Sequence, residues 1–116
     1  METDARKRYD KFMTSKQEPL RLSLALSEFA RTDIPDAWKD AYMVYLRRRI
    51  RPGMMSLVRE DDSLTLAALS QGIPLPAEAV EDAITLAAAE HSIAALVWLL
   101  RWKQDHGGFP DRDFSL

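Results

Sequence analysis

The sequence predicts an all-α fold of six or seven helices, and three observations lead to this prediction. Apolar residues recur at helical spacing along most of the chain. The one stretch that also alternates like a strand, residues 19–31, is rich in leucine and alanine and has no β-branched residue, so we interpret it as helix. Proline and glycine separate the periodic stretches from one another. We therefore expect helices joined by short turns.

The composition is that of one globular domain. The 116 residues are 47% hydrophobic and 29% charged, which places the chain among folded proteins. We expect a single helical domain, 1–116, with N-terminal helices (1–51), helix pairs (52–106) and a tail (107–116). There is no cysteine, the first residues lack an apolar signal core, and no apolar run is long enough to span a membrane. We expect a cytoplasmic, bacterial protein.

Three helices are predicted in the first part. The first covers about 4–13, with Thr3 or Asp4 as its cap. The second begins at Pro19 after a linker at 15–18, and the third covers about 35–51, where Pro52-Gly53 is expected to end it.

Shorter helices follow. Residues 54–59 are predicted to form a brief apolar turn, and Asp61 and Asp62 are expected to cap a helix that ends at Gly72. Residues 73–76, Ile-Pro-Leu-Pro, form an extended connector, because each proline disfavours helix in the residue before it. A helix is then predicted at about 77–89, and a last one at 92–105 with Ser92 as a cap.

The last helix is apolar on two sides. A stripe of four aliphatic residues at helical spacing is expected to be buried: Ile93, Leu96, Val97 and Leu100. Trp98 and Trp102 project from nearly the opposite side. Either the tail, with its Phe114, folds over the two indoles, or they form an exposed patch that docks a protein partner or a second copy of the chain. In the second interpretation Arg101 and Lys103 lie at the rim of the contact surface.

The charge is unevenly distributed. Residues 1–58 carry 12 lysines and arginines against 8 acidic residues, a net charge of +4, whereas residues 59–116 carry 4 against 10, a net charge of −6. This asymmetry can orient a partner or pair two copies of the chain head to tail, although solvated surfaces produce similar imbalances. The alternative function is that of a nucleic-acid-associated regulator. Its anion-binding residues would be Arg6, Lys7, Arg8, Arg47, Arg48, Arg49 and Arg51.

A repeat is visible in the second half. Ala67-Ala68-Leu69 and Trp98-Leu99-Leu100 each end the apolar part of a helix, and a shorter helix precedes each. The last unit resembles an ankyrin repeat, with 86–88 (Leu-Ala-Ala) in the first helix, His91-Ser92 in the turn and Leu96, Leu99 and Leu100 in the second helix. The Thr-Pro-Leu-His opening and the turn glycine of that family are missing, and HEAT-like pairing is a neighbouring interpretation. The resemblance implies a short stack of helix pairs.

A second resemblance covers most of the chain. Residues 45–48 (Tyr-Leu-Arg-Arg), 100–103 (Leu-Arg-Trp-Lys) and 113–116 (Asp-Phe-Ser-Leu) are similar to uncharacterised helical tail modules of Gram-positive gut bacteria. That likeness implies an accessory interaction module. Together with the apolar last helix, it favours a non-catalytic protein–protein interaction module.

No pattern of catalytic or metal-binding residues emerges. His91 and His106 are too far apart for ligation from one helix face, and Glu90-His91 lacks the second histidine of a zinc helix. We interpret His91 as a turn residue and His106 as a cation at a helix end. The acidic clusters lack the glycine of a calcium loop, and no glycine belongs to a phosphate-binding motif. We therefore expect neither an enzyme nor a cofactor.

Overall fold

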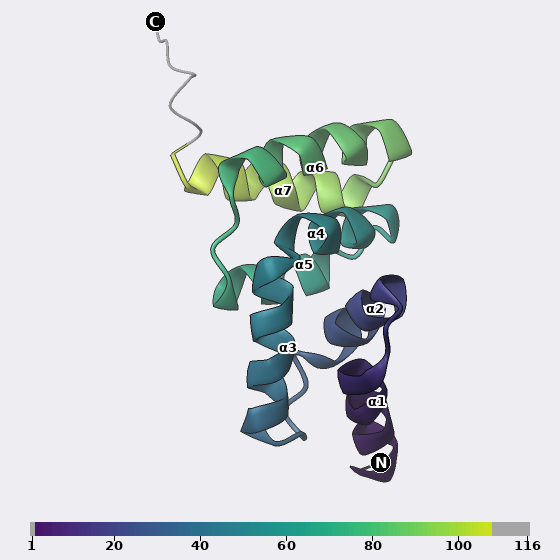
Figure 1. Cartoon of the computed structure of the whole chain (residues 1–116). Coiled ribbons are helices and arrows are strands. Elements are labelled where there is room, and N and C mark those ends of the chain that lie inside the picture. The colour runs from purple at the N-terminus through teal and green to yellow at the C-terminus, as the bar shows by residue number, and fades with distance from the viewer. Residues whose placement is uncertain (1, 108–116) are drawn as a thin grey trace, which may run out of the picture. The chain divides into compact units, whose positions relative to one another are not determined.

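The computed structural model describes residues 2–107, which form seven helices and no strand (Figure 1). The helices are α1 (Glu2–Thr14), α2 (Glu18–Glu28), α3 (Asp36–Arg48), α4 (Ile50–Arg59), α5 (Ser63–Gly72), α6 (Ala77–Glu90) and α7 (Ile93–Asp105). The predicted all-α fold is confirmed. Thr3 and Asp4 lie inside α1 rather than at its start, so the predicted cap of the first helix is wrong.

The chain divides into two compact units, 1–53 and 54–116, which we call the N-terminal and the C-terminal unit. The division falls inside α4. Because residues 54–58 carry no charge, the charge asymmetry of the sequence follows the units: the N-terminal unit has a net charge of +4 and the C-terminal unit −6.

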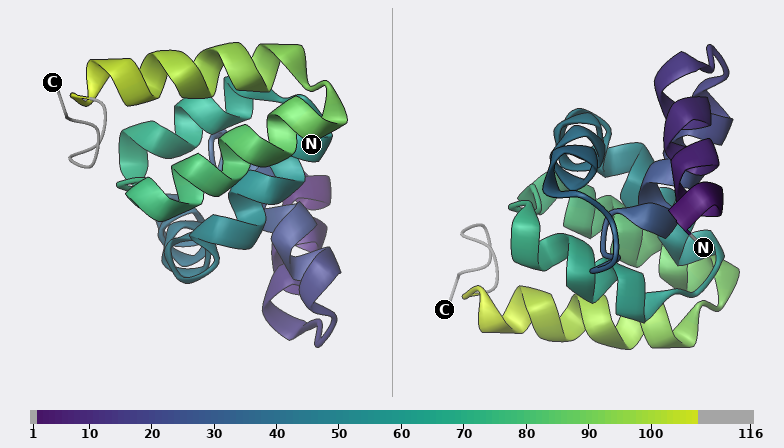
Figure 2. Two further views of the ribbon diagram at one scale, coloured as in Figure 1. Left: turned by 90° about the horizontal axis from the view of Figure 1, so that it is seen from above. Right: turned by 90° about the horizontal axis from the view of Figure 1, so that it is seen from below.

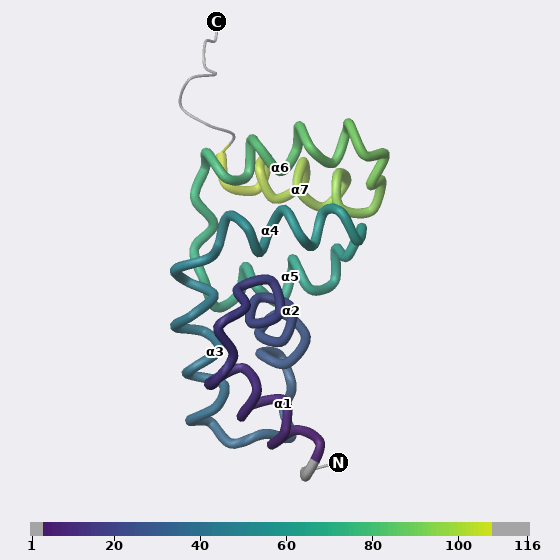
Figure 3. The backbone as a smooth tube through the Cα atoms, turned by 45° about the vertical axis from the view of Figure 1, so that its right-hand side comes forward, coloured from purple at the N-terminus to yellow at the C-terminus, as the bar shows by residue number. Residues whose placement is uncertain are grey.

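The N-terminal unit is held together by aromatic rings. Its helix α2 packs against both α1 and α3 (Figure 3). Tyr9 of α1 stacks on Trp38 of α3 at 4.8 Å between ring centroids, and Phe12 packs against Tyr42 at 4.7 Å and Tyr45 at 5.2 Å. Such ring pairs stabilise a core beyond the area they bury. The rings thus join α1 to α3.

A break at Arg49 separates α3 from α4, which corrects the prediction of one helix ended by Pro52-Gly53. Proline has no N–H, and its ring collides with the carbonyl four residues earlier, so a helix cannot continue through Arg48 to Pro52. Instead Pro52 and Gly53 lie in the first turn of α4, where a missing N–H leaves no hydrogen bond unmade. The predicted short turn at 54–59 is therefore the remainder of α4.

Aliphatic residues and alanine fill the C-terminal unit. Helix α7 lies along its edge and packs against α6 and α5 (Figure 2). The buried residues of α6 include Ala79, Val80, Ala83 and Ala87, and α5 buries Leu66 and Leu69. Small alanine side chains let neighbouring helix backbones approach closely, so this unit is packed without any buried ring among its described residues.

The turns α4–α5 and α6–α7 have the same backbone hydrogen bonds. Asp61 and His91 both have a left-handed backbone, with φ of 53° and 59°. In each turn the N–H of this residue donates to the carbonyl three positions earlier, and the N–H of the next residue donates to the carbonyl five positions earlier. The bonds are Asp61 N to Val58 O and Asp62 N to Leu57 O in the first turn, and His91 N to Ala88 O and Ser92 N to Ala87 O in the second. This is the Schellman ending of a helix. The two left-handed residues lie 91 − 61 = 30 positions apart.

Candidate functional site

Helix α7 is rotated relative to the sequence prediction. Ala95 and Leu99 are completely buried, whereas Ile93, Val97 and Leu100 are 59%, 53% and 47% exposed. The prediction that these three aliphatic residues are buried is therefore wrong, and Leu96, the fourth of the stripe, is only half-buried. At about 100° per residue, Trp98 and Trp102 lie on the side of Ala95 and Leu99. The helix thus packs with its tryptophan side inward.

Two long-range hydrogen bonds set this rotation. The Ala95 N–H donates to Asp61 Oδ1 at 2.8 Å, so the turn before α5 caps the start of α7. The Ser92 hydroxyl, predicted as the cap, donates instead to Val58 O at 2.6 Å. Asp62 caps α5 as predicted, because its Oδ1 accepts from Thr65 N at 3.0 Å. The two turns are therefore bonded to each other.

The two indoles are only partly accessible. Trp98 and Trp102 are half-buried, and the Trp102 ring stacks on the His106 ring with centroids 3.9 Å apart. His106 Nδ1 also lies 2.7 Å from Trp102 O. Phe114 and the tail predicted to cover the indoles lie outside the described residues, so that alternative stays a prediction.

The two cations of the predicted rim differ. Lys103 Nζ lies 2.7 Å from Glu81 Oε2, and this ion pair joins α7 to α6. Arg101 is exposed and no ion pair is recorded for it among residues 4–107. Arg101 is thus the exposed cation of the predicted rim.

The rotation leaves an apolar surface that we call the α7 aliphatic face: Ile93, Ala94, Val97 and Leu100. The first three of these line an open hollow of about 620 Å³. Its other lining residues are Asp61, Ser63, Trp98 and Arg101. Leu64, beside Ser63 in α5, is 84% exposed. Contiguous exposed apolar residues on a folded surface are typical of contact sites. Sequence reasoning missed the place of Asp61 in this hollow, since Asp61 was expected only to cap the helix that follows it.

Three of the seven residues predicted to bind anions have contacts within the N-terminal unit. Arg6 lies 6.0 Å from the centroid of the Trp38 ring, Arg8 Nε lies 3.0 Å from Glu28 Oε2, and Arg49 Nε donates to Glu18 Oε1 at 3.2 Å. The other four are exposed: Lys7, Arg47, Arg48 and Arg51. Part of the basic character of the unit is therefore used inside it.

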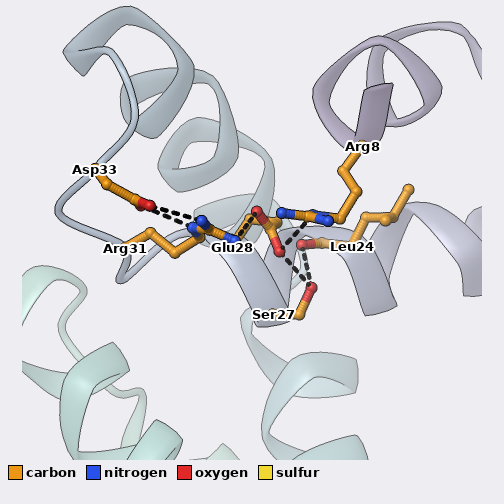
Figure 4. A network of polar contacts seen from close by, with 6 residues as sticks. All are labelled: Arg8, Leu24, Ser27, Glu28, Arg31 and Asp33. Carbon is orange, nitrogen blue, oxygen red and sulfur yellow. Dashed lines mark hydrogen bonds and ion pairs between the residues drawn. The ribbon is translucent and has the colours of Figure 1, made fainter. Parts of the chain in front are cut away.

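A buried carboxylate accounts for the role of Arg8. Glu28, only 4% exposed, lies between Arg8 and Arg31 (Figure 4). Arg31 Nε and Nη2 donate to the two carboxylate oxygens of Asp33 at 2.8 and 2.7 Å, and this pairing lowers the pKa of Asp33 to about 2. Buried charges in proteins are paired, as Glu28 is here. The network fixes the turn after α2 and is structural.

A second polar cluster surrounds Tyr45. Its hydroxyl donates to Glu18 Oε1 at 2.7 Å, and this bond, with that from Arg49, lowers the pKa of Glu18. Burial and the Glu18 hydrogen bond raise the pKa of Tyr45, while burial, with the charges of Glu28 and Tyr9, raises the pKa of Tyr42 to about 12. None of these groups titrates near neutrality, so no general acid or base emerges from the cluster.

Within the described part of the chain, no three metal-ligating side chains come together, and no helix is long and apolar enough to cross a membrane. The chain matches no family model, no curated protein and no solved structure. The geometry of the two units is therefore the basis for inferring function.

Proposed function

We propose that the protein is a non-catalytic protein–protein interaction module of the helical-repeat type, with its contact surface on the α7 aliphatic face. One observation carries the proposal. Ile93, Val97 and Leu100, at positions i, i+4 and i+7, are each about half exposed on a helix that buries Ala95 and Leu99 completely on its opposite side. This is the spacing at which one helix contacts another.

The repeat character rests on the two turns. They share a hydrogen-bond pattern and lie 30 residues apart in sequence, and each is followed by a helix, α5 or α7, that packs within the C-terminal unit. A short stack of helix pairs is the arrangement that the ankyrin-like resemblance implies. Such stacks bind partners along one exposed face, here the face of α7.

The partner that fits is an amphipathic helix with apolar residues along one side and basic residues at the flanks. Its apolar side would cover Ile93, Val97 and Leu100, and its bases would meet a unit of net charge −6. Pairing two copies through the same face would bring two such units together, which like charges oppose. The partner is therefore a different protein.

Two synthetic helices test this proposal: a labelled leucine–lysine helix and a leucine–glutamate helix of the same length. We expect the leucine–lysine helix to bind. Val97→Asp should lower its affinity at least tenfold because an apolar contact is lost, even though the new carboxylate should attract lysine. Thr85→Asp on α6 adds the same charge at another exposed position and should leave binding unchanged. Equal binding by the two variants contradicts the assigned face. A dimer by light scattering that Val97→Asp dissociates would replace the partner helix with a second copy.

Nucleic acid is the second candidate partner. The net charge of +4 on the N-terminal unit and the exposure of Lys7, Arg47 and Arg48 favour it, whereas the internal pairing of Arg8 and Arg49 weakens it. A salt titration of duplex and single-strand binding decides, because several phosphate contacts give a steep fall of affinity with salt. If the protein binds only a partner helix, as in our first proposal, we expect no nucleic-acid binding whose affinity falls steeply with salt.

A further inference from the structure

The N-terminal unit contains an open pocket of about 490 Å³ that the proposed interaction face does not use. It lies among α1, α2 and α3. Its lining residues are Phe12, Met13, Arg21, Asp40, Ala41, Val44, Tyr45, Arg48 and Arg49. The volume is within the range of sites for small organic molecules.

One part of the pocket is apolar. Phe12 and Met13 come from α1, and Ala41, Val44 and Tyr45 come from α3. Phe12 and Tyr45 are held edge to face, 5.2 Å apart, so their positions are fixed by the core. Met13 and Val44, by contrast, are 52% and 50% exposed. These two side chains are available to cover an apolar ligand.

The other part is cationic. Arg21 lies 4.7 Å and Arg49 5.8 Å from the centroid of the Tyr45 ring, and Glu18 pairs with both. Glu18 thus holds these two guanidinium groups in place while cancelling one of their charges. Arg48 is exposed and has no recorded ion pair among residues 4–107. It is the cation left for a ligand.

The net charge of the pocket indicates the charge of the ligand. Three arginines face two carboxylates, those of Glu18 and Asp40, so the pocket and its support carry 3 − 2 = +1. A single carboxylate balances this charge, whereas a dianion would be repelled by Asp40 and Glu18. Guanidinium groups bind carboxylates through paired hydrogen bonds.

We propose that this pocket binds a small organic acid made of an apolar body and one carboxylate. The body lies against Met13 and Val44, above the fixed Phe12 and Tyr45 rings, and the carboxylate meets Arg48. The site is separate from the α7 aliphatic face, and either can exist without the other.

A matched pair of probes tests the pocket: 4-phenylbutyrate and 4-phenylbutan-1-ol, titrated into the protein and followed by NMR. We expect the acid to shift the Met13 and Val44 methyl signals and to bind about tenfold more tightly than the alcohol. N-acetylphenylalanine serves as a third probe, with its carboxylate on a peptide unit. Tighter binding of this probe than of 4-phenylbutyrate would overturn the free acid in favour of a peptide C-terminus.

Two neighbouring arginines provide the control. Arg48→Gln should weaken the acid about tenfold and leave the alcohol unchanged, whereas Arg47→Gln, one residue away and outside the pocket, should change neither. Val44→Asp, at a half-exposed position, should abolish binding because its carboxylate pairs with Arg48 one turn later. Equal losses in the two arginine variants, equal affinity for acid and alcohol, or no saturable binding at millimolar acid would each overturn the proposal.

Discussion

The two units use different chemistry to pack helices. The N-terminal unit joins α1 to α3 through five aromatic rings. It also buries the carboxylate of Glu28 in α2 against Arg8 and Arg31. The C-terminal unit packs alanine and aliphatic residues and relies on hydrogen bonds between its turns. The comparison teaches that similar helices can depend on side-chain rings and charges in one unit and on backbone geometry in the other.

This difference bears on function. A unit built from rings and arginines has polar groups in place around a pocket, which suits a small charged ligand. A unit built from alanine and closely packed backbones can leave one helix face aliphatic and exposed, which suits another helix.

The largest expected effect is on the ring cluster. Phe12→Ala should lower the free energy of unfolding by about 3 to 5 kcal/mol, because Phe12 is buried against two tyrosines and the vacated space cannot fully collapse. Met13→Ala, next in sequence and half-exposed, is the control and should cost about 1 kcal/mol or less. Urea unfolding followed by circular dichroism measures both. Equal costs would remove the ring cluster from the comparison.

The second largest effect should be a loss of stability of the N-terminal unit at alkaline pH. All three tyrosines lie in the N-terminal unit, and Tyr42 has its pKa raised to about 12, chiefly by burial. A raised pKa means that the folded state favours the protonated phenol, so stability is fully present below pH 10 and is lost as pH rises toward 12. The loss should reach roughly 2 to 3 kcal/mol. Tyrosinate absorbance against pH measures the pKa values of the tyrosines, and Tyr42→Phe identifies the contribution of Tyr42. Titration of every tyrosine near pH 10 would contradict this account.

The turn of the C-terminal unit is the third target. Asp61→Ala should lower stability by about 1 to 2 kcal/mol, because it removes the cap on Ala95 N and places alanine at a φ of 53°. Asp61→Asn keeps an acceptor and tolerates this backbone, so it should cost much less. Thermal unfolding of the pair tests the turn. If both variants unfold alike, the hydrogen bond between the turns is unimportant.

The smallest effect should be a gain. His91 has a φ of 59° at the end of α6, is exposed and has no side-chain hydrogen bond recorded among the described residues. Glycine adopts this conformation without strain, so His91→Gly should raise stability by about 0.5 to 1 kcal/mol. The shift in the urea midpoint measures it, and a loss of stability would mean that the imidazole makes a contact that stabilises α6.

The sequence predicted where the helices lie better than how they face one another. Proline and glycine positions and the Asp62 cap were sufficient for α5, α6 and the connector between them, since these signals act locally. The break at Arg49 was placed a few residues too late because Pro52 acts on the carbonyl of Arg48.

The rotation of α7 could not be predicted in the same way. Both sides of the helix are apolar, so periodicity alone does not choose between them. The choice depends on Asp61, 34 residues before Ala95, and on the close fit of Ala95 and Leu99. The candidate site moved with it, from the indoles toward Ile93, Val97 and Leu100. The pocket was missed for a related reason: Arg48 and Val44 meet Phe12 and Arg21 only in the folded unit.

Methyl NMR during titration with the leucine–lysine helix tests the α7 aliphatic face most directly. Our account predicts that the Ile93, Val97 and Leu100 methyl signals shift together to saturation, while those of Met13 and Val44 in the N-terminal unit stay in place. Unchanged signals on α7, with the helix bound elsewhere or not bound, would contradict the account.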